Sequence, residues 1–391
     1  MVFTPTLINY TDRPAQVRSA TIVVAAHDAT DRERRNADLV CRGVDDQTVI
    51  QEAIDYLSGT GGIVQLTTGD FEISGFIDPG DYVWTRGMGR ATLLDMALLS
   101  TDVGFHAGAD GIAARTGFKI SDLRVDGNFA GTDNNSDTSL FQFHDCTDIE
   151  IDNVEANRSQ STAFYVLGPS TSGIRIHNFR GTGSSRGLIE IAEGTNIEIN
   201  HVVSIEDNVT NKGPSINLEG GASRTISNAR LNNIYVKSPT GANTGISIDG
   251  DALSGVVLTN FTIEGLAIHQ LRIVGTSLVR VSNGVITGGT NSVTLDADNR
   301  AINRLSISDL TLYTPVSAGI ACNFSLTSAK IHVRNIDIYG ESFTSLGVVV
   351  AAAPDDDVTS FYLDDTHIYN VVSEGVRDAT AKITQHNVTV V

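Results

Sequence analysis

The stretch IEIDNVEANRSQSTAFYVLGPSTSGIRIHN, residues 149–178, contains one full period of a repeat. It begins and ends with the same five-residue pattern, in which the first and third residues are apolar and the fifth is Asn. Such alternation is typical of a β-strand with one buried face, and Asn tolerates the left-handed backbone of a tight turn. A second alternating run, AFYVLG at 163–168, lies between the two copies. One period therefore predicts two short strands and no helix.

The five-residue pattern occurs eleven times in the chain. Its last residue is in turn Asp122, Asn153, Asn178, His201, Asn233, Asn260, Asn283, Asp309, Asn335, Asp365 and Asn387. The ten intervals are 22 to 32 residues long, and none contains a helical period. Repeats of this kind predict a solenoid, and their irregular length argues against a propeller or a sandwich. We predict an all-β fold, a single-stranded right-handed parallel β-helix, with the Asn column as a supporting ladder at an internal turn.

One segment ahead of the repeat, residues 45–58, has a helical period instead. Its apolar face consists of Val49, Ile50, Ala53, Ile54 and Leu57. Asp45 or Asp46 can cap its N-terminus, and Gly59 can end it. Because a solenoid exposes unpaired edges at its ends, we expect this helix to cap the first coil.

The two ends of the chain differ in this respect. The repeat continues to NVTVV at the C-terminus with no evident cap. Such an apolar end predicts that other copies of the chain or a partner cover it, and by analogy we expect a trimer. The sequence thus divides into an N-terminal segment, 1–44, for attachment or oligomerisation, and a β-helix, 45–391, that begins with the capping helix.

The charge of the chain limits its partners. The formal net charge is −19, from 46 acidic and 27 basic residues; 33 of the acids are Asp and 5 of the bases are Lys. A negative surface repels phosphate, so we expect no nucleic-acid partner. Asp-rich, Lys-poor surfaces suit high salt, where charges are screened, so a halophilic source and an ordinary acidic extracellular protein both fit.

Three further features bear on the location of the protein. Cys41, Cys146 and Cys322 are odd in number and far apart, which predicts buried thiols without a disulfide framework. No run approaches the ~18 apolar residues of a membrane span, so we expect no membrane insertion. The first residues, MVFTPTLINYTDRPAQ, lack the charged and apolar regions of a signal peptide. We therefore expect an extracellular or virion location, reached without a signal peptide in this chain.

Two stretches resemble known β-helix families. Roughly residues 20–95, which include the stretch from TIVVAAHD at 21 to GDFEIS at 74, are similar to the opening module of pectate-lyase-like β-helix proteins, among them tail spikes and other virion proteins of bacterial and archaeal viruses. GFKISDLRVDGNFAG, from Gly117, looks like a coil of mannuronan C5-epimerases and related alginate lyases. That family has Tyr-Gly-Phe-Asp-Pro-His one coil later, where this chain has STAFYVLGPSTSG without Asp or His. The resemblance therefore implies the fold, and the catalytic roles of that family are not carried over.

The outward faces of the strands are the expected place for function, because apolar side chains fill the inside of the coils. In the second strand of each period, alternation assigns to the outside a first column of Gln142, Tyr165, Glu190, Asn217, Ser247, Arg272 and Thr294. A parallel second column consists of His144, Leu167, Ala192, Glu219, Asp249, Val274 and Asp296. This mixture of carboxylates, amides, an aromatic ring and an arginine suits an extended glycan. We expect substrate contacts from Gln142, His144, Tyr165, Asn217, Arg272 and Asp296.

Three carboxylates in these columns are candidate catalytic groups: Glu190, Glu219 and Asp249. Glu219 and Asp249 would lie on adjacent coils, roughly 5 Å apart. Glu190 would lie about 8 Å from Glu219, within the ~6.5–9.5 Å that an inverting glycosidase needs for its water. Neighbouring carboxylates also raise one pKa, as a general acid requires. The alternative is a polar outer surface on which acids align by chance.

Two other groups of residues could bind ligands. Asp126, Asp133 and Asp137 in the loop 126–139 could ligate calcium, although a solvated loop fits the spacing better. Calcium is the sole cofactor considered, and no other metal site is predicted. The basic residues Arg175, His177, Arg180 and Arg186 could hold an acidic sugar or pair with nearby acids.

Together these observations predict a virion tail-spike or fibre-type host-attachment protein that binds a cell-surface polysaccharide and could depolymerise it. Its partners would then be the glycan and other virion proteins. The first alternative is a secreted lyase, glycoside hydrolase or uronate epimerase that acts on an acidic polysaccharide. The second is a structural β-helix without a catalytic site. Whether the protein is an enzyme stays open at this point.

Overall fold

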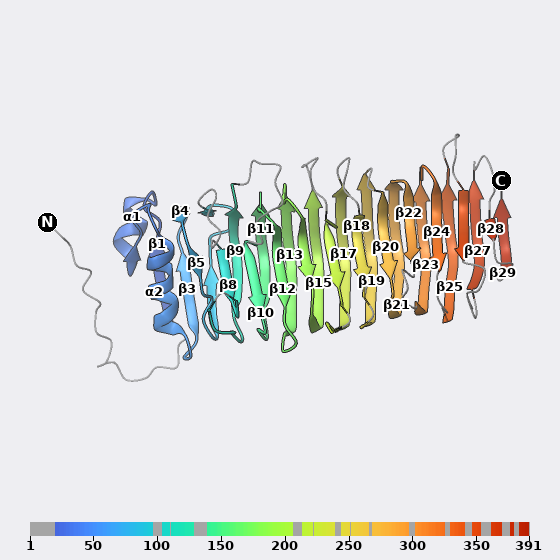
Figure 1. The fold of residues 1–391 in the computed structure, drawn as a ribbon. Coiled ribbons are helices and arrows are strands. Elements are labelled where there is room, and N and C mark those ends of the chain that lie inside the picture. The colour runs from blue at the N-terminus through green and yellow to red at the C-terminus, as the bar shows by residue number, and fades with distance from the viewer. Residues whose placement is uncertain are drawn as a thin grey trace.

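The computed structural model is a parallel β-solenoid whose strands stack along one axis, from the blue N-terminal end to the red C-terminal end (Figure 1). It describes residues 20–96, 104–109, 111–128, 139–205, 213–221, 223–238, 244–250, 252–265, 268–296, 302–324, 329–340, 346–352, 361–369, 376–378 and 383–390. All strand pairs that connect successive coils are parallel, for example β11 with β13 and β12 with β14. The predicted fold class is confirmed.

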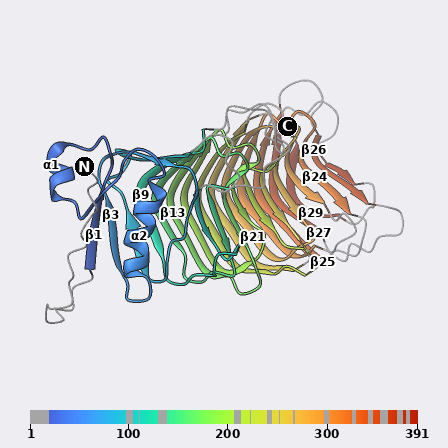
Figure 2. The same cartoon turned by 60° about the vertical axis from the view of Figure 1, so that its left-hand side comes forward.

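The described strands form two sheets. The 17-stranded sheet, called sheet A, consists of β1 (Ala20–Ala25), β2 (Leu39–Val40), β3 (Gly62–Leu66), β4 (Gly69–Ile73), β6 (Val83–Arg86), β7 (Thr92–Met96), β9 (Lys119–Asp126), β11 (Glu150–Asn157), β13 (Ser172–Thr182), β15 (Gly194–Ile205), β17 (Ile226–Ser238), β19 (Leu253–Gly265), β21 (Ser277–Gly288), β23 (Asn303–Tyr313), β25 (Ala329–Tyr339), β27 (Phe361–Tyr369) and β29 (Ile383–Val390). The 12-stranded sheet, called sheet B, consists of β5 (Phe76–Ile77), β8 (Gly104–Ala107), β10 (Phe141–His144), β12 (Thr162–Leu167), β14 (Gly187–Ile191), β16 (Ile216–Glu219), β18 (Thr244–Asp249), β20 (His269–Val274), β22 (Asn291–Asp296), β24 (Ala318–Phe324), β26 (Leu346–Ala352) and β28 (Val376–Asp378). From β9 onward the chain alternates between the sheets, so each coil contributes one strand to each (Figure 2).

Apolar side chains of both sheets fill the space between them. The residues assigned to the inside of sheet B are fully buried: Phe141, Phe143, Phe164, Val166, Ile189, Ile191, Ile216, Leu218, Ile246 and Ile248. The first coils of the repeat are filled with aromatic rings, such as those of Phe141 and Phe164, whose centroids lie 6.3 Å apart. Because neighbouring residues of a strand point to opposite faces, this core directs the intervening side chains outward.

The polar column at the end of each five-residue pattern marks a bend within the strands of sheet A. All eleven residues have a positive φ, between 45° and 58°. Several bond to the coil before, as when Asn153 Nδ2 donates to Asp122 Oδ1 over 2.7 Å and Asn335 Nδ2 donates to Asp309 Oδ1 over 2.7 Å. Most of these side chains are exposed, however, so the ladder lies on the outside of the coil, and the prediction of an internal turn is wrong.

The helix expected over 45–58 is α2 (Gln47–Leu57), and it lies at the N-terminal end of the solenoid (Figure 1). Its buried residues, Ile50, Ala53, Ile54 and Leu57, belong to the continuous hydrophobic core. A short helix that the sequence analysis missed, α1 (Asp31–Asn36), precedes it with a capping box of Thr30 and Glu33. Strand β1 pairs with β3, so the described ladder of sheet A already includes Ala20, ahead of residue 45.

The N-terminus of α2 is held differently from the prediction. Asp46 is the N-cap residue, but its side chain makes no capping hydrogen bond. Instead its buried carboxylate accepts backbone N–H groups from Arg42, Gly43 and Glu72, each over 3.0 Å. The predicted side-chain cap is therefore wrong, because this carboxylate ties the helix to β4 and to the segment before it.

Two smaller predictions can be compared directly with the structure. Cys41, Cys146 and Cys322 are buried free thiols, as expected. None of the described helices is long and apolar enough to cross a membrane.

Candidate functional site

The outward face of sheet B brings the predicted site residues into two columns. In the first, strand pairing places Gln142, Tyr165, Glu190, Asn217, Ser247, Arg272 and Thr294 successively side by side. In the second, His144 pairs with Leu167. Farther along, Glu219 pairs with Asp249, Asp249 with Val274, and Val274 with Asp296. Five members of these columns are buried: Ala192, Asn217, Ser247, Val274 and Thr294. The accessible side chains of this face are therefore those of β10, β12 and β14, Glu219 at the end of β16, and the acids around Arg272.

Glu190, on β14, is half-buried on this face. Its Oε2 accepts a hydrogen bond from Thr162 Oγ1 over 3.1 Å. Burial raises the pKa of the Glu190 carboxyl above its ordinary value, and the charge of Glu219 adds to the effect. Thr162, Arg186 and Arg224 oppose this shift without cancelling it. A carboxyl group in this environment holds its proton to higher pH than an exposed one, which suits a general acid.

Tyr165, on β12, is the register partner of Glu190 and is also half-buried. Burial and the charge of Glu190 raise the pKa of its hydroxyl. Its ring meets the His144 ring edge-on, with the centroids 5.8 Å apart, and Gln142 Nε2 lies 3.4 Å from His144 Nε2. These four side chains form a continuous polar and aromatic surface across β10, β12 and β14.

Glu219, at the end of β16, is exposed, unlike Glu190. Its Oε2 accepts a hydrogen bond from Asn217 Nδ2 over 3.0 Å. Asn217 in turn is the register partner of Glu190, so Glu219 lies one coil along and two residues farther down its strand. The two carboxylates thus have the predicted placement, and they differ in burial.

Asp249, the third predicted catalytic residue, belongs to a different group. Arg272 on β20 bridges two carboxylates: its Nη1 lies 3.1 Å from Asp249 Oδ2 and its Nη2 lies 3.4 Å from Asp296 Oδ2. At the start of the same strand His269 Nδ1 lies 2.7 Å from Thr294 Oγ1, and burial lowers the pKa of His269. Asp249 is thus engaged in an ion pair with Arg272, which distinguishes it from Glu190 and Glu219.

Arg224 is a residue that the sequence analysis missed. It is half-buried in the segment before β17, and its charge acts on both Glu190 and Tyr165. Arg186, immediately before β14, acts on the same two groups. The sequence offers a weak signal for both arginines, because each lies where a loop meets a strand. The alternation that assigns side chains to the inner or outer face does not extend to such positions.

Three of the basic residues that the sequence offered as a site for an acidic sugar lie on sheet A. Arg175 Nε is 3.8 Å from Glu150 Oε2, and His177 Nε2 is 3.4 Å from Glu198 Oε1. Arg180 lies on the same strand, β13. These three side chains are therefore separated from Glu190, which lies on sheet B. Arg175 and His177 lie next to acids, as expected under the alternative that these basic residues pair with nearby carboxylates.

The predicted calcium loop is described in part. The carboxylate of Asp126 accepts hydrogen bonds from Arg158 Nε and Nη2 over 2.7 and 2.6 Å. Asp133 and Asp137 lie outside the described residues. Among the described residues no cluster of three or more His, Cys, Asp or Glu side chains could hold a metal ion. In the described part of the loop, Asp126 is engaged in an ion pair with Arg158.

Comparison with known proteins identifies the fold. No protein-family model and no curated protein matches the chain. Among solved structures, the A-module of mannuronan C-5 epimerase AlgE4 from Azotobacter vinelandii is similar with a TM-score of 0.57 at 16% identity, over 88% of this chain and 96% of that one. The catalytic domain of a GH87 alpha-1,3-glucanase gives 0.65 at 13% identity, over 89% and 68%. The tailspike protein gp49 of Acinetobacter baumannii bacteriophage Fri1, a capsular polysaccharide depolymerase, gives 0.57 at 13% identity, over 88% and 66%. These neighbours act on polysaccharides, and the chain shares with them the right-handed parallel β-helix fold of the pectate-lyase-like proteins.

Proposed function

We propose that the protein is a polysaccharide depolymerase whose glycan site is the outward face of sheet B over β10 to β16. The observation that carries this proposal is the pair of Glu190 and Glu219. One carboxyl is half-buried with a raised pKa, the other is exposed, and they lie on adjacent coils. Tyr165 and His144 extend the same face and would contact the sugar rings beside the cleaved bond.

The reaction that this arrangement supports is hydrolysis by general acid and general base. Protonated Glu190 gives its proton to the glycosidic oxygen as the bond between that oxygen and the anomeric carbon breaks. Ionised Glu219 takes a proton from a water molecule, whose oxygen forms the new bond to the anomeric carbon. Exchange with solvent then returns both carboxyls to their starting states. A separation of roughly 6.5–9.5 Å, as the strand geometry predicts, leaves room for this water and would invert the anomeric configuration.

The biological setting that we propose is a virion tail spike or fibre that attaches to a host-surface glycan. Two observations support it: the resemblance of roughly residues 20–95 to the opening module of viral β-helix proteins, and the similar fold of a phage tailspike depolymerase. The rival setting is a secreted lyase, hydrolase or epimerase, and the fold of AlgE4 supports that alternative equally well. Virion proteins would be partners in the first setting alone.

The test is incubation with a panel of bacterial and archaeal surface polysaccharides, followed by assays of reducing ends and of the ultraviolet absorbance of unsaturated products. We expect new reducing ends without unsaturated products. Glu190→Gln and Glu219→Gln should each lower the rate about 10²–10⁴-fold, the usual contribution of acid–base groups. Arg180→Gln on sheet A is the matched control and should cleave like the wild type. Unsaturated products, or full activity in both variants, would contradict the assignment.

A further inference from the structure

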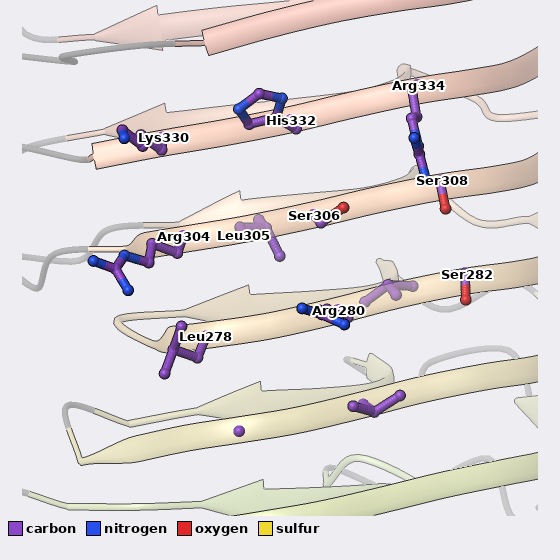
Figure 3. Close-up of a pocket in the computed structure, with 13 residues that line it drawn as sticks. Leu278, Arg280, Ser282, Arg304, Leu305, Ser306, Ser308, Lys330, His332 and Arg334 are labelled. Atoms are coloured by element: carbon purple, nitrogen blue, oxygen red, sulfur yellow. The ribbon is translucent and has the colours of Figure 1, made fainter.

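A group of basic side chains on the outward face of sheet A has no role in the site described above. Figure 3 shows Arg280 on β21, Arg304 on β23, and Lys330, His332 and Arg334 on β25 lying along three successive coils. All five side chains are exposed. We call this group the basic groove.

The basic groove is unusual because three of its five side chains lack an acidic partner among the described residues. In a chain of net charge −19, several described cations pair with acids, as Arg115 does with Asp78 and Arg158 with Asp126. Within the described part of the chain, Arg280, Arg304 and Lys330 make no ion pair and no side-chain hydrogen bond. Three uncompensated charges repel one another, which costs stability unless an anion is bound.

Two members of the groove, Arg334 and His332, interact with neighbouring side chains and lie at its border. Arg334 acts on Asp309 and is the register partner of Asp364. The ring of His332 stacks on that of Tyr362, with the centroids 4.6 Å apart and the planes 26° from parallel. The uncompensated part of the groove is therefore formed by Arg280, Arg304 and Lys330.

The backbone sets the spacing of the three cations. Leu278, Arg304 and Lys330 have φ values of 57°, 55° and 53°, and they form a second column of left-handed bends. Strand pairing places Arg280 beside Ser306 and Ser306 beside His332. Adjacent strands are about 4.8 Å apart, so Arg304 and Lys330, which share one column, are spaced by roughly the length of one sugar residue. Arg280 lies one coil before Arg304, in the column of Ser306.

The surface between these side chains is concave and partly apolar. It forms an open depression of about 870 Å³, lined by Leu278, Leu305 and Ser306 as well as the cations. Leu278 is 48% exposed although it is a large aliphatic residue. Isolated phosphate or sulfate needs no such apolar wall, whereas a sugar ring packs its C–H face on one.

From this combination we propose that the basic groove binds a segment of a polyanionic glycan that carries carboxylate or sulfate groups. The site is separate from the proposed depolymerase face, because it lies on sheet A and shares no residue with it. It would hold an anionic chain to the protein whichever reaction takes place on sheet B. A duplex nucleic acid fits less well, since the cations span three coils and the rest of the chain is strongly negative.

The test compares two triple variants that remove the same charge. Arg280→Gln, Arg304→Gln and Lys330→Gln together empty the groove. Arg32→Gln, Arg35→Gln and Arg42→Gln together remove three exposed charges near α1 and α2. Binding of polygalacturonate, dextran sulfate, neutral dextran and duplex DNA is measured by calorimetry at low and physiological salt.

We expect polygalacturonate or dextran sulfate to bind the wild type and the control variant equally, and the groove variant at least tenfold more weakly. Binding should also weaken as salt rises, and neutral dextran should not bind. Equal loss in both variants, equal binding of neutral dextran, or tighter groove-dependent binding of DNA would each overturn the proposal. Because the readout is binding, its failure is distinguishable from failure of the proposed depolymerase activity, which the groove variant should retain.

Discussion

Glu190 illustrates how one side chain acquires a chemical role from its place in the coil. Alternation in β14 directs it outward, yet neighbouring side chains leave it half-buried, so its charge loses contact with water. Glu219 one coil away adds repulsion, and both effects raise its pKa. Each effect opposes ionisation, so Glu190 keeps its proton to a higher pH than an exposed glutamate does.

The raised pKa of Glu190 predicts a pH dependence of stability. Below the ordinary glutamate value of 4.5 the carboxyl is neutral in both folded and unfolded chains. As pH rises through the folded-state pKa, the unfolded chain ionises first, so the folded state loses stability. Glu190→Gln removes this dependence. We therefore expect the variant to gain thermal stability relative to wild type as pH rises from about 4 toward 7, measured by calorimetry at several pH values. A difference in melting temperature that is constant with pH would contradict the shift.

The bends of sheet A give a second prediction at this scale. Asn335 has a φ of 52° and donates to Asp309 Oδ1. Asn335→Ala loses the bond and places a Cβ in the left-handed region, so it should destabilise by about 1–2 kcal/mol. Asn335→Gly keeps the bend and loses the bond, so its cost should be smaller. Denaturant unfolding of both variants checks the order, and equal stability of the two would show that the left-handed backbone is not what Asn335 supplies.

At the scale of elements, α2 and the first coils act as one packed unit. The helix buries Ile50, Ala53, Ile54 and Leu57 in the same core that the sheets enclose. The Asp46 carboxylate adds three backbone hydrogen bonds that tie it to Glu72 of β4 and to the preceding segment. A capping function of α2 stays a prediction, and the packing of its apolar face offers a way to test it.

We predict that Ile54→Ala destabilises the protein by about 2–5 kcal/mol, because it leaves a cavity between helix and first coil. Tyr56→Ala on the same helix is the control, since Tyr56 is 55% exposed, and it should cost much less. Unfolding is followed by circular dichroism. If α2 caps the solenoid, Ile54→Ala should also increase hydrogen exchange in β1 and β3 and leave β23 unchanged. Unaltered exchange in β1 and β3 would contradict capping.

At the scale of the whole molecule, what could be predicted from the sequence follows the stacking of like residues. The alternation in AFYVLG and LIEIAE predicts which side chains of sheet B face the core, and the eleven polar residues mark the left-handed bends. Parallel stacking then predicts the outward columns, including the pairing of Glu219 with Asp249. The ion pair of Arg272 with Asp249, the outward position of the Asn ladder and the role of Arg224 could not be predicted, because they depend on side-chain rotamers and loop paths.

The assembly of the molecule is a separate prediction. The analogy with viral spikes predicts a trimer, so light scattering at micromolar concentration should give three times the chain mass of 41.6 kDa. The light-scattering measurement uses the chain without any truncation. A monomer at that concentration would contradict the trimer and would weaken the virion setting.

The most direct test of the central claim is a crystal structure of the Glu190→Gln variant with an oligosaccharide from the polysaccharide that the wild type degrades. The account predicts that the sugar lies on sheet B across β12, β14 and β16. Its glycosidic oxygen should lie within hydrogen-bond distance of the amide that replaces the Glu190 carboxyl, and Tyr165 should contact a neighbouring ring. A glycan bound away from this face, with positions 190 and 219 remote from every glycosidic bond, would contradict it.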